Sequence, residues 1–249
     1  MLSHATFRFY EELNDFLPFD KKKVEFVYPF DGNPSIKHVI EAIGVPHAEV
    51  DLILVNSQPV DFNYILKDND YVSVYPVFET LDISGVSPLR KKTLRELKFV
   101  LDVHLGKLAK YLRMLGFDTL YRNDNDDKEI VRISLEEHRV ILSRDIGLLK
   151  VKSVSHAYFI RNQYPKDQLT EVLNHFDLYK AINPFNRCIK CNGHLDSVEK
   201  ETIIQQLEPL TKKYFNEFFR CNHCQSIFWK GSHFDHMTSF IREIQGSKS

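Results

Sequence analysis

The 249-residue sequence lacks an excess of charge and any long apolar run. Its formal net charge is −1 and its pI is about 6.8, so it has no overall basic character of the kind that marks many nucleic-acid-binding proteins. Any contact with nucleic acid must therefore depend on local groups of lysine and arginine. No stretch approaches the ~20 apolar residues of a membrane span, and the first residues lack the apolar core of a signal peptide. We therefore expect a cytoplasmic protein with no membrane partner.

Cysteine is also scarce, but the four cysteines form two CxxC pairs separated by 29 residues. Each pair can present two thiolates, and two pairs form a tetrahedral sulfur site suited to Zn²⁺. A reducing compartment disfavours the alternative of disulfide bonds. Because four sulfur ligands leave no open position, we expect a structural zinc ion, and the nearby His194 and His223 are not needed as ligands. The predicted ligands are Cys188, Cys191, Cys221 and Cys224.

Residues 5–84 are predicted to form a small α+β domain. Strand-forming runs lie at residues 7–10, 24–30, 52–55 and 71–78. Between the second and third runs, Ser35 begins a helix with apolar residues at three- and four-residue spacing, which ends near Gly44. The order ββαββ is typical of a β-grasp fold.

Residues 99–183 alternate between apolar runs and helical stretches, which predicts an α/β domain with a parallel sheet. The runs lie at residues 99–101, 118–121, 140–142 and 157–160. The helix after the first run carries one apolar stripe, which indicates core packing. That stripe consists of Leu105, Leu108, Ala109, Leu112 and Leu115.

Acidic residues follow three of these runs. Asp102 follows the first, Asp126 and Asp127 lie beyond the second, and Asp145 follows the third. The carboxyl ends of parallel strands meet at one edge of a sheet, and clustered carboxylates need a cation to offset their repulsion. Oxygen ligands suit Mg²⁺ or Mn²⁺, so the pattern predicts metal-dependent phosphodiester hydrolysis. Each residue also stands where a helix N-cap would serve, and this alternative stays open.

The stretch from residue 99 to 149, with the cysteine segment, resembles the Mut7-C ribonuclease family, a branch of the PIN-like nucleases. The resemblance rests on Asp102, LGKLA at 105–109, LRMLG at 112–116, Asp118, the Asp126–Asp127 pair and SRD at 143–145. The first segment resembles the ubiquitin-like domain that accompanies this nuclease, notably in IEAIGVPHAEVDLILVNSQPVDFNYILKDNDYVSVYPVF. The implied architecture is a β-grasp domain (5–84), a connector (85–98), a PIN-like domain (99–183) and a zinc ribbon (184–245).

The resemblance implies a ribonuclease that uses Mg²⁺ or Mn²⁺ to cut single-stranded or structured RNA. Asp102 and Asp145 would be metal ligands, and Asp126 or Asp127, with Asp124 as a competitor, would be the third acid. A fourth acid is not evident, because the next one after Asp145 is Asp167. The alternative is a non-catalytic RNA- or ribosome-binding adaptor with a degenerate PIN-like domain.

Several cations and aromatic residues are candidates for RNA contacts, because cations bind phosphates and aromatic rings stack on bases. Each can equally be a surface charge or a packing residue, and the basic connector can be a solvated face. The candidates are Lys107, Arg113, Arg144, the connector residues Arg90, Lys91, Lys92 and Arg95, and Trp229 and His233.

The β-grasp segment lacks the free Gly-Gly end of small sulfur-carrier proteins, since Ser84 and Gly85 are followed by further chain. We therefore do not expect a covalent carrier. Three roles stay open for this domain: it can position RNA, dock a protein or ribosome partner, or only support its neighbour.

Overall fold

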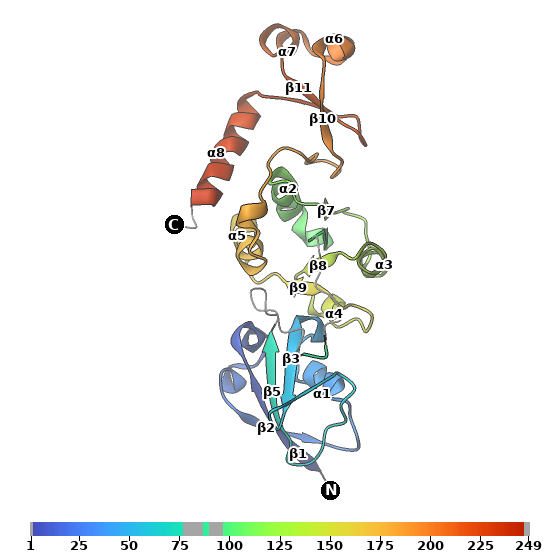
Figure 1. Ribbon diagram of the computed structural model, residues 1–249, viewed down its shortest axis with the longest axis vertical. Helices are drawn as coiled ribbons and strands as arrows, with labels where there is room; N and C mark the ends of the chain where they lie inside the picture. The colour runs from blue at the N-terminus through green and yellow to red at the C-terminus, as the bar shows by residue number, and fades with distance from the viewer. Residues whose placement is uncertain (1, 77–86, 90–96, 247–249) are drawn as a thin grey trace. The chain divides into compact units, whose positions relative to one another are not determined.

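A computed structural model describes residues 2–76, 87–89 and 97–246 (Figure 1). The chain forms two compact units, one from residues 1–96 and 131–159 and the other from 97–130 and 160–249, within the described ranges. Most of the predicted connector, with Arg90, Lys91, Lys92 and Arg95, lies outside the described residues, as does the segment 77–86. None of the described helices is long and apolar enough to cross a bilayer.

The first unit contains the predicted β-grasp fold. Its sheet has the order β2-β1-β5-β3-β4, in which β1 and β5 are parallel and the other pairs are antiparallel. The short strand β4 was not predicted. The elements are β1 (Ser3–Phe9), η1 (Glu11–Phe16), η2 (Phe19–Lys21), β2 (Phe26–Phe30), α1 (Ile36–Ile43), η3 (His47–Glu49), β3 (Val50–Val55), β4 (Gln58–Val60) and β5 (Tyr71–Pro76).

Helix α1 begins and ends where the sequence predicts. The side chain of Ser35 accepts a hydrogen bond from the His38 N–H, which is the expected N-cap. Gly44 ends the helix with a φ of +128°, a conformation that suits glycine. The apolar residues of the helix and sheet then form one buried core. It includes Phe7, Phe9, Ile36, Val39, Ile40, Ile53, Val72 and Val74.

The same unit contains β8 (Val140–Ser143), α4 (Ile146–Leu149) and β9 (Ala157–Phe159), which contact the β-grasp fold. Nε2 of the buried His47 lies 2.8 Å from the Val154 carbonyl oxygen, and Lys150 Nζ donates to the Glu41 carbonyl at 2.8 Å. The rings of Phe16 and Phe159 meet edge to face with their centroids 5.3 Å apart. The β-grasp fold is thus packed against a segment more than 100 residues away in the sequence.

The α/β prediction is confirmed by a four-stranded sheet of order β7-β6-β8-β9, in which β6 with β7 and β8 with β9 are parallel pairs. The apolar stripe of α2 is fully buried, as predicted. The further elements are β6 (Phe99–Leu101), η4 (Val103–Leu105), α2 (Gly106–Met114), β7 (Thr119–Leu120), α3 (Asp127–Glu137), α5 (Pro165–His175) and η5 (Leu178–Ala181).

The C-terminal part of the second unit is a three-stranded antiparallel ribbon of order β10-β11-β12. Two short helices and a 3-10 turn also lie between the two CxxC pairs, and a C-terminal helix follows; none of them is predicted from the sequence. Helices of four to six residues show too little periodicity to be predicted. The elements are β10 (Leu195–Val198), α6 (Lys200–Ile203), η6 (Ile204–Gln206), α7 (Pro209–Tyr214), β11 (Phe218–Cys221), β12 (Ile227–Trp229) and α8 (Ser232–Gly246).

Gly116, which lies just beyond the end of α2, has a φ of +98° and almost no free space for a side chain. A Cβ atom at this position would lie 2.1 Å from the carbonyl oxygen of Asn183. The Asn183 N–H in turn donates to the Leu115 carbonyl at 3.0 Å. The glycine therefore lets the segment before the cysteine ribbon approach the end of α2.

We expect Gly116→Ala to destabilise the second unit by about 2–5 kcal/mol, because it combines a left-handed conformation with a backbone clash. Gly246→Ala is the matched control, since a Cβ there meets nothing within 4 Å. Urea unfolding followed by the fluorescence of Trp229, the one tryptophan of the chain, reports on this unit. Equal stability of the two variants would contradict the steric argument.

Candidate metal centre and acidic residues

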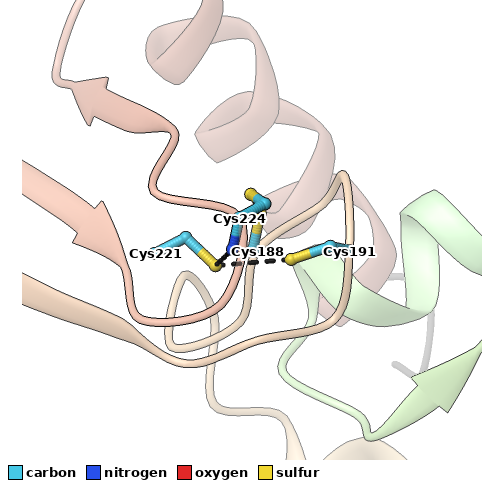
Figure 2. Close-up of side chains that lie close together, drawn as sticks. All are labelled: Cys188, Cys191, Cys221 and Cys224. Carbon is cyan, nitrogen blue, oxygen red and sulfur yellow. Dashed lines mark hydrogen bonds between the residues drawn. The ribbon is translucent and has the colours of Figure 1, made fainter.

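The four cysteines converge on one point (Figure 2). All four Sγ atoms lie within 4.8 Å of one another; Cys191 and Cys221 are 3.3 Å apart, and Cys188 and Cys224 are 3.7 Å apart. Four ligands at a Zn–S distance of about 2.3 Å in a tetrahedron are separated by roughly 3.8 Å. A disulfide needs about 2.05 Å, and all four cysteines are free. The cysteines can therefore hold a metal ion, and their chemistry fits Zn²⁺.

The two CxxC turns have the same backbone pattern. In each pair the backbone carbonyl of the first cysteine accepts a hydrogen bond from the N–H four residues later. The Cys188 carbonyl accepts from Asn192 at 2.9 Å, and the Cys221 carbonyl accepts from Gln225 at 3.1 Å. These two residues also have positive φ angles, +74° and +59°. Asn192 is followed by Gly193, where a Cβ would lie 2.8 Å from the Cys221 sulfur. The Asn-Gly pair, a turn signal in the sequence, is thus part of the site although it was not predicted.

The thiols differ in their tendency to ionise. Burial raises the pKa of Cys188 to about 12, and burial also raises the pKa of Cys191. At Cys224 burial opposes ionisation, but hydrogen bonds with Ser226 lower its pKa to about 6. Buried thiols with raised pKa values lose their protons at neutral pH when a cation binds in their place, so metal binding and proton release are coupled.

The buried guanidinium of Arg113 joins helix α2 to the first CxxC turn. Its Nη1 donates to the carbonyls of Lys190 at 3.1 Å and Ile189 at 3.3 Å, inside that turn. Its Nε donates to the Thr119 carbonyl at 2.8 Å and Nη2 to the Tyr121 carbonyl at 3.3 Å. Burial lowers the pKa of Arg113, whereas the nearby Cys191, Cys188 and Asp118 raise it.

This arrangement favours a structural role for Arg113 over the predicted one. Arg113 was a candidate for phosphate binding, but its side chain is only 3% exposed and its donors face four carbonyl oxygens. A phosphate would have to displace these contacts. The sequence could not reveal this role, because the carbonyls that Arg113 binds lie up to 77 residues away.

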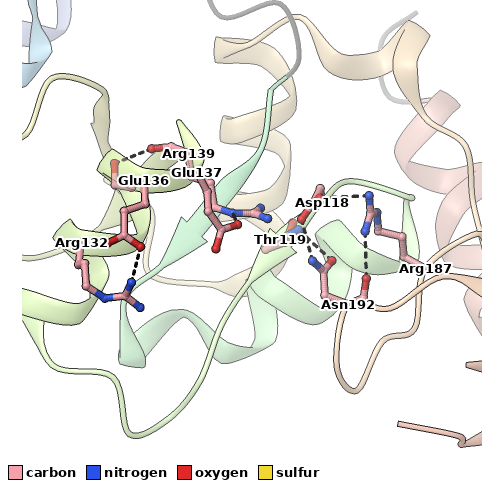
Figure 3. A network of polar contacts seen from close by, with 9 residues as sticks. Asp118, Thr119, Arg132, Glu136, Glu137, Arg139, Arg187 and Asn192 are labelled. Carbon is pink, nitrogen blue, oxygen red and sulfur yellow. Dashed lines mark hydrogen bonds and ion pairs between the residues drawn. The ribbon is translucent and has the colours of Figure 1, made fainter. Parts of the chain in front are cut away.

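A second set of contacts joins β7 to the same turn (Figure 3). Asn192 Nδ2 donates to Asp118 Oδ1 at 2.7 Å, and the Thr119 N–H donates to Asn192 Oδ1 at 2.9 Å. Arg187 forms an ion pair with Asp118 at 3.2 Å and donates to the Asn192 carbonyl at 3.0 Å. Asp118, one of the residues behind the family resemblance, therefore anchors the cysteine ribbon.

Asp102 and Asp145 each follow a strand of the parallel sheet, as predicted. Asp102 comes directly after β6 and is 5% exposed, and its carbonyl accepts from the Leu105 N–H at 3.0 Å. Asp145 is exposed and caps α4, since its Oδ1 accepts from the Gly147 N–H at 2.7 Å. Its own N–H donates to Ser143 Oγ at 2.8 Å.

The three acids between β7 and α3 have different surroundings. Asp126 accepts from the Glu129 N–H at 2.8 Å and so caps α3, and Asp127 is the first residue of that helix. Asp124 forms a two-point contact with Arg122 at the surface, which lowers the pKa of its carboxyl. Within either unit, the four cysteines are the only group of three or more described histidine, cysteine or carboxylate side chains that lie close enough together to hold an ion.

The remaining candidates for RNA contacts lie in four different parts of the fold and are all at least partly exposed. Lys107 is exposed on α2, and Arg144 is half-buried beside Asp145. Trp229 ends β12 and is 38% exposed, and His233 is exposed in the first turn of α8.

Comparison with protein families gives two matches. Residues 97–241 match the Mut7-C RNAse domain, which spans both the parallel-sheet region and the cysteine ribbon. This chain belongs to the Mut7-C RNAse domain family. Residues 2–82 match the Mut7-C ubiquitin domain, in agreement with the β-grasp fold of the first unit. No curated protein and no solved structure matches the chain.

We expect the Mut7-C chain to bind one zinc ion at its four cysteines, measured by elemental analysis of the purified protein. Cys221→Ser should release the metal and unfold the ribbon locally, because metal binding supplies much of the folding free energy of such a module. A zinc content near zero together with intact disulfides would contradict this assignment.

We expect Arg113→Met to destabilise the Mut7-C domain by at least about 2 kcal/mol, because it leaves buried carbonyls without donors. Zinc release to a chelator should accelerate about 10- to 100-fold, in line with the loss of a group that supports metal ligands. Lys110→Met is the control, since Lys110 is exposed on the same helix. Unchanged zinc release combined with weaker RNA binding would restore the phosphate-binding interpretation.

Proposed function

We propose that this protein is a metal-dependent ribonuclease that hydrolyses RNA phosphodiester bonds. The observation that carries the proposal is the match of residues 97–241 to the Mut7-C RNAse domain, in a chain where Asp102 and Asp145 follow strands of a parallel sheet. Ligands bind at the carboxyl ends of the strands in such sheets.

In this proposal Asp102 and Asp145 hold Mg²⁺ or Mn²⁺, and Asp126 or Asp127 supplies a further ligand or orients water. The cation, when bound, supplies an activated water at neutral pH. Capping does not exclude ligation, because the cap at Asp145 occupies only Oδ1 with the Gly147 N–H. Burial of Asp102 supports the same role, since a carboxylate in a low-dielectric position benefits strongly from a cation.

RNA would be held by cations around these acids. Lys107 and Arg144 are the candidates among the described residues, and Arg90, Lys91, Lys92 and Arg95 stay candidates from the sequence. The β-grasp domain would fix how RNA or a protein partner approaches, and its contacts with the β8–β9 segment support a positioning role. A cytoplasmic location is part of the proposal, because a Cys₄ site needs reduced thiols.

A second candidate function is a non-catalytic adaptor that binds RNA or the ribosome. The capping roles of Asp126 and Asp145 favour it, because helix capping alone accounts for these two residues. The two functions differ in whether RNA is cut, so one assay separates them.

We expect RNA cleavage with Mn²⁺ or Mg²⁺, and a loss of at least about 100-fold in rate for Asp102→Asn and for Asp145→Asn. This bound follows because even residues that only support metal ligands contribute about 10- to 100-fold. Asp196→Asn is the control, since Asp196 is an exposed acid of the ribbon strand β10 and has no part in the proposed site. The assay follows a labelled single-stranded RNA, with zinc content measured for every variant.

Cleavage that persists in both Asp→Asn variants would place the chemistry elsewhere. Absence of cleavage by the zinc-loaded wild type with either cation, together with retained RNA binding, would favour the adaptor.

A further inference from the structure

A cavity of about 270 Å³ lies in the second unit, where the ribbon strands meet helix α8. Three of its aromatic residues come from β11 and β12, and a fourth comes from α8. No carboxylate lines it, and both of its charged residues are cations. The residues that matter for the argument are Arg187, Phe219, Phe228, Trp229, Lys230 and Phe234.

The two cations differ in how firmly they are held. Arg187 is mostly buried, and its guanidinium is held by the Asp118 carboxylate and the Asn192 carbonyl. It therefore lines one side of the cavity in a fixed position. Lys230 pairs with Glu217, but both side chains are about half exposed or more. Such surface ion pairs contribute little free energy, so an incoming phosphate can replace Glu217 as the partner of Lys230.

Trp229 is placed so that its ring is accessible. Its side chain is 38% exposed, and its ring centroid is 6.3 Å from that of Phe215. A Cβ at Gly231 would lie 3.1 Å from Trp229 Nε1 and 3.3 Å from Cδ1, so the glycine provides room for the indole. Next to it, Lys190 Nζ lies 5.8 Å from the centre of the Phe228 ring, which adds a third positive charge near the cavity.

We propose that this cavity binds one unpaired base of an RNA strand, with Trp229 or Phe228 stacked on the base and Lys230 on an adjacent phosphate. The cavity volume of about 270 Å³ is just below the ~300–1,000 Å³ of pockets that bind drug-sized ligands. A cavity of this size suits a single planar base. The aromatic rings of the cavity can stack on the base of a nucleotide, and its cations can bind the phosphate. The absence of a carboxylate avoids repulsion of that phosphate. The proposal rests on the proposed function in that RNA is the ligand, but it does not require cleavage.

The single tryptophan makes base binding directly observable. The experiment uses full-length, zinc-loaded Asp145→Asn protein, a seven-nucleotide uridine RNA and a strand of the same length that lacks bases. We expect the uridine RNA to quench the Trp229 fluorescence and the strand without bases to leave it unchanged. A labelled form of the uridine RNA gives the Kd by fluorescence anisotropy.

We expect Trp229→Ala to weaken RNA binding about 5- to 150-fold, the range found for the loss of one stacked base. Trp229→Phe should stay within a few-fold of the parent, because a ring for stacking remains. Tyr214→Ala is the matched control, since Tyr214 is also an exposed aromatic of this module but does not line the cavity. Its RNA affinity should be unchanged.

An unquenched Trp229 together with unchanged affinity of Trp229→Ala would overturn the proposal. Quenching by a phenylalanine-containing acidic peptide but not by uridine RNA would also overturn it and assign the cavity to a protein partner. Failure of the wild type to cut RNA, with quenching intact, would reject the nuclease and leave the base-binding site in place. Cleavage without quenching would reject the base-binding site and leave the nuclease in place.

Discussion

The second unit depends on the buried guanidinium of Arg113, which lies between helix α2 and the first CxxC turn. A Zn²⁺ ion with four thiolates carries a net charge of −2, and such a charge near a protein core needs nearby cations. Arg113 supplies one, since it interacts electrostatically with Cys191 and Cys188. Arg187 is paired with Asp118 and holds the same turn through the Asn192 carbonyl. Because Arg113 also binds the carbonyls of Thr119 and Tyr121, the conformation around β7 and that of the metal site are coupled. The cysteine ribbon is therefore part of the same structure as α2 and β7, which agrees with a family match that spans both.

The acids of the proposed active site have two compatible roles. Asp126 and Asp145 cap helices, and capping fixes the position of a carboxylate at the end of a strand or loop. A ligand for a hard cation needs the same fixed placement, since ordering a mobile side chain opposes binding. The side chain of Asp102 is instead held in place by burial, since this residue is 5% exposed. The distinction between structural and catalytic acids is therefore weaker here than the sequence patterns suggest.

Local patterns predicted most of the fold. The strands before the acids, the helix after Ser35 and the two CxxC pairs were predicted correctly, because each of these patterns involves residues close together in the chain. Long-range partners could not be predicted. The role of Arg113 depends on carbonyls in a turn 76 or 77 residues later, and the sheet order and the cavity beside α8 depend on tertiary packing. Helix α8 was missed since only Ile241 and Ile244 among its residues are buried, which leaves a weak apolar pattern.

The contacts of His47 with Val154 and of Glu41 with Lys150 have a consequence for synthesis of the chain on the ribosome. The β-grasp strands, which end at Pro76, are complete long before residues 131–159 exist. At ~5–20 residues per second, several seconds separate the two events, and contacts between such distant segments form slowly. During this interval the surface that later receives the β8–β9 segment is exposed on the nascent chain. Rare codons or a bound chaperone in this window would change the yield of folded protein, even though the mature molecule would be the same.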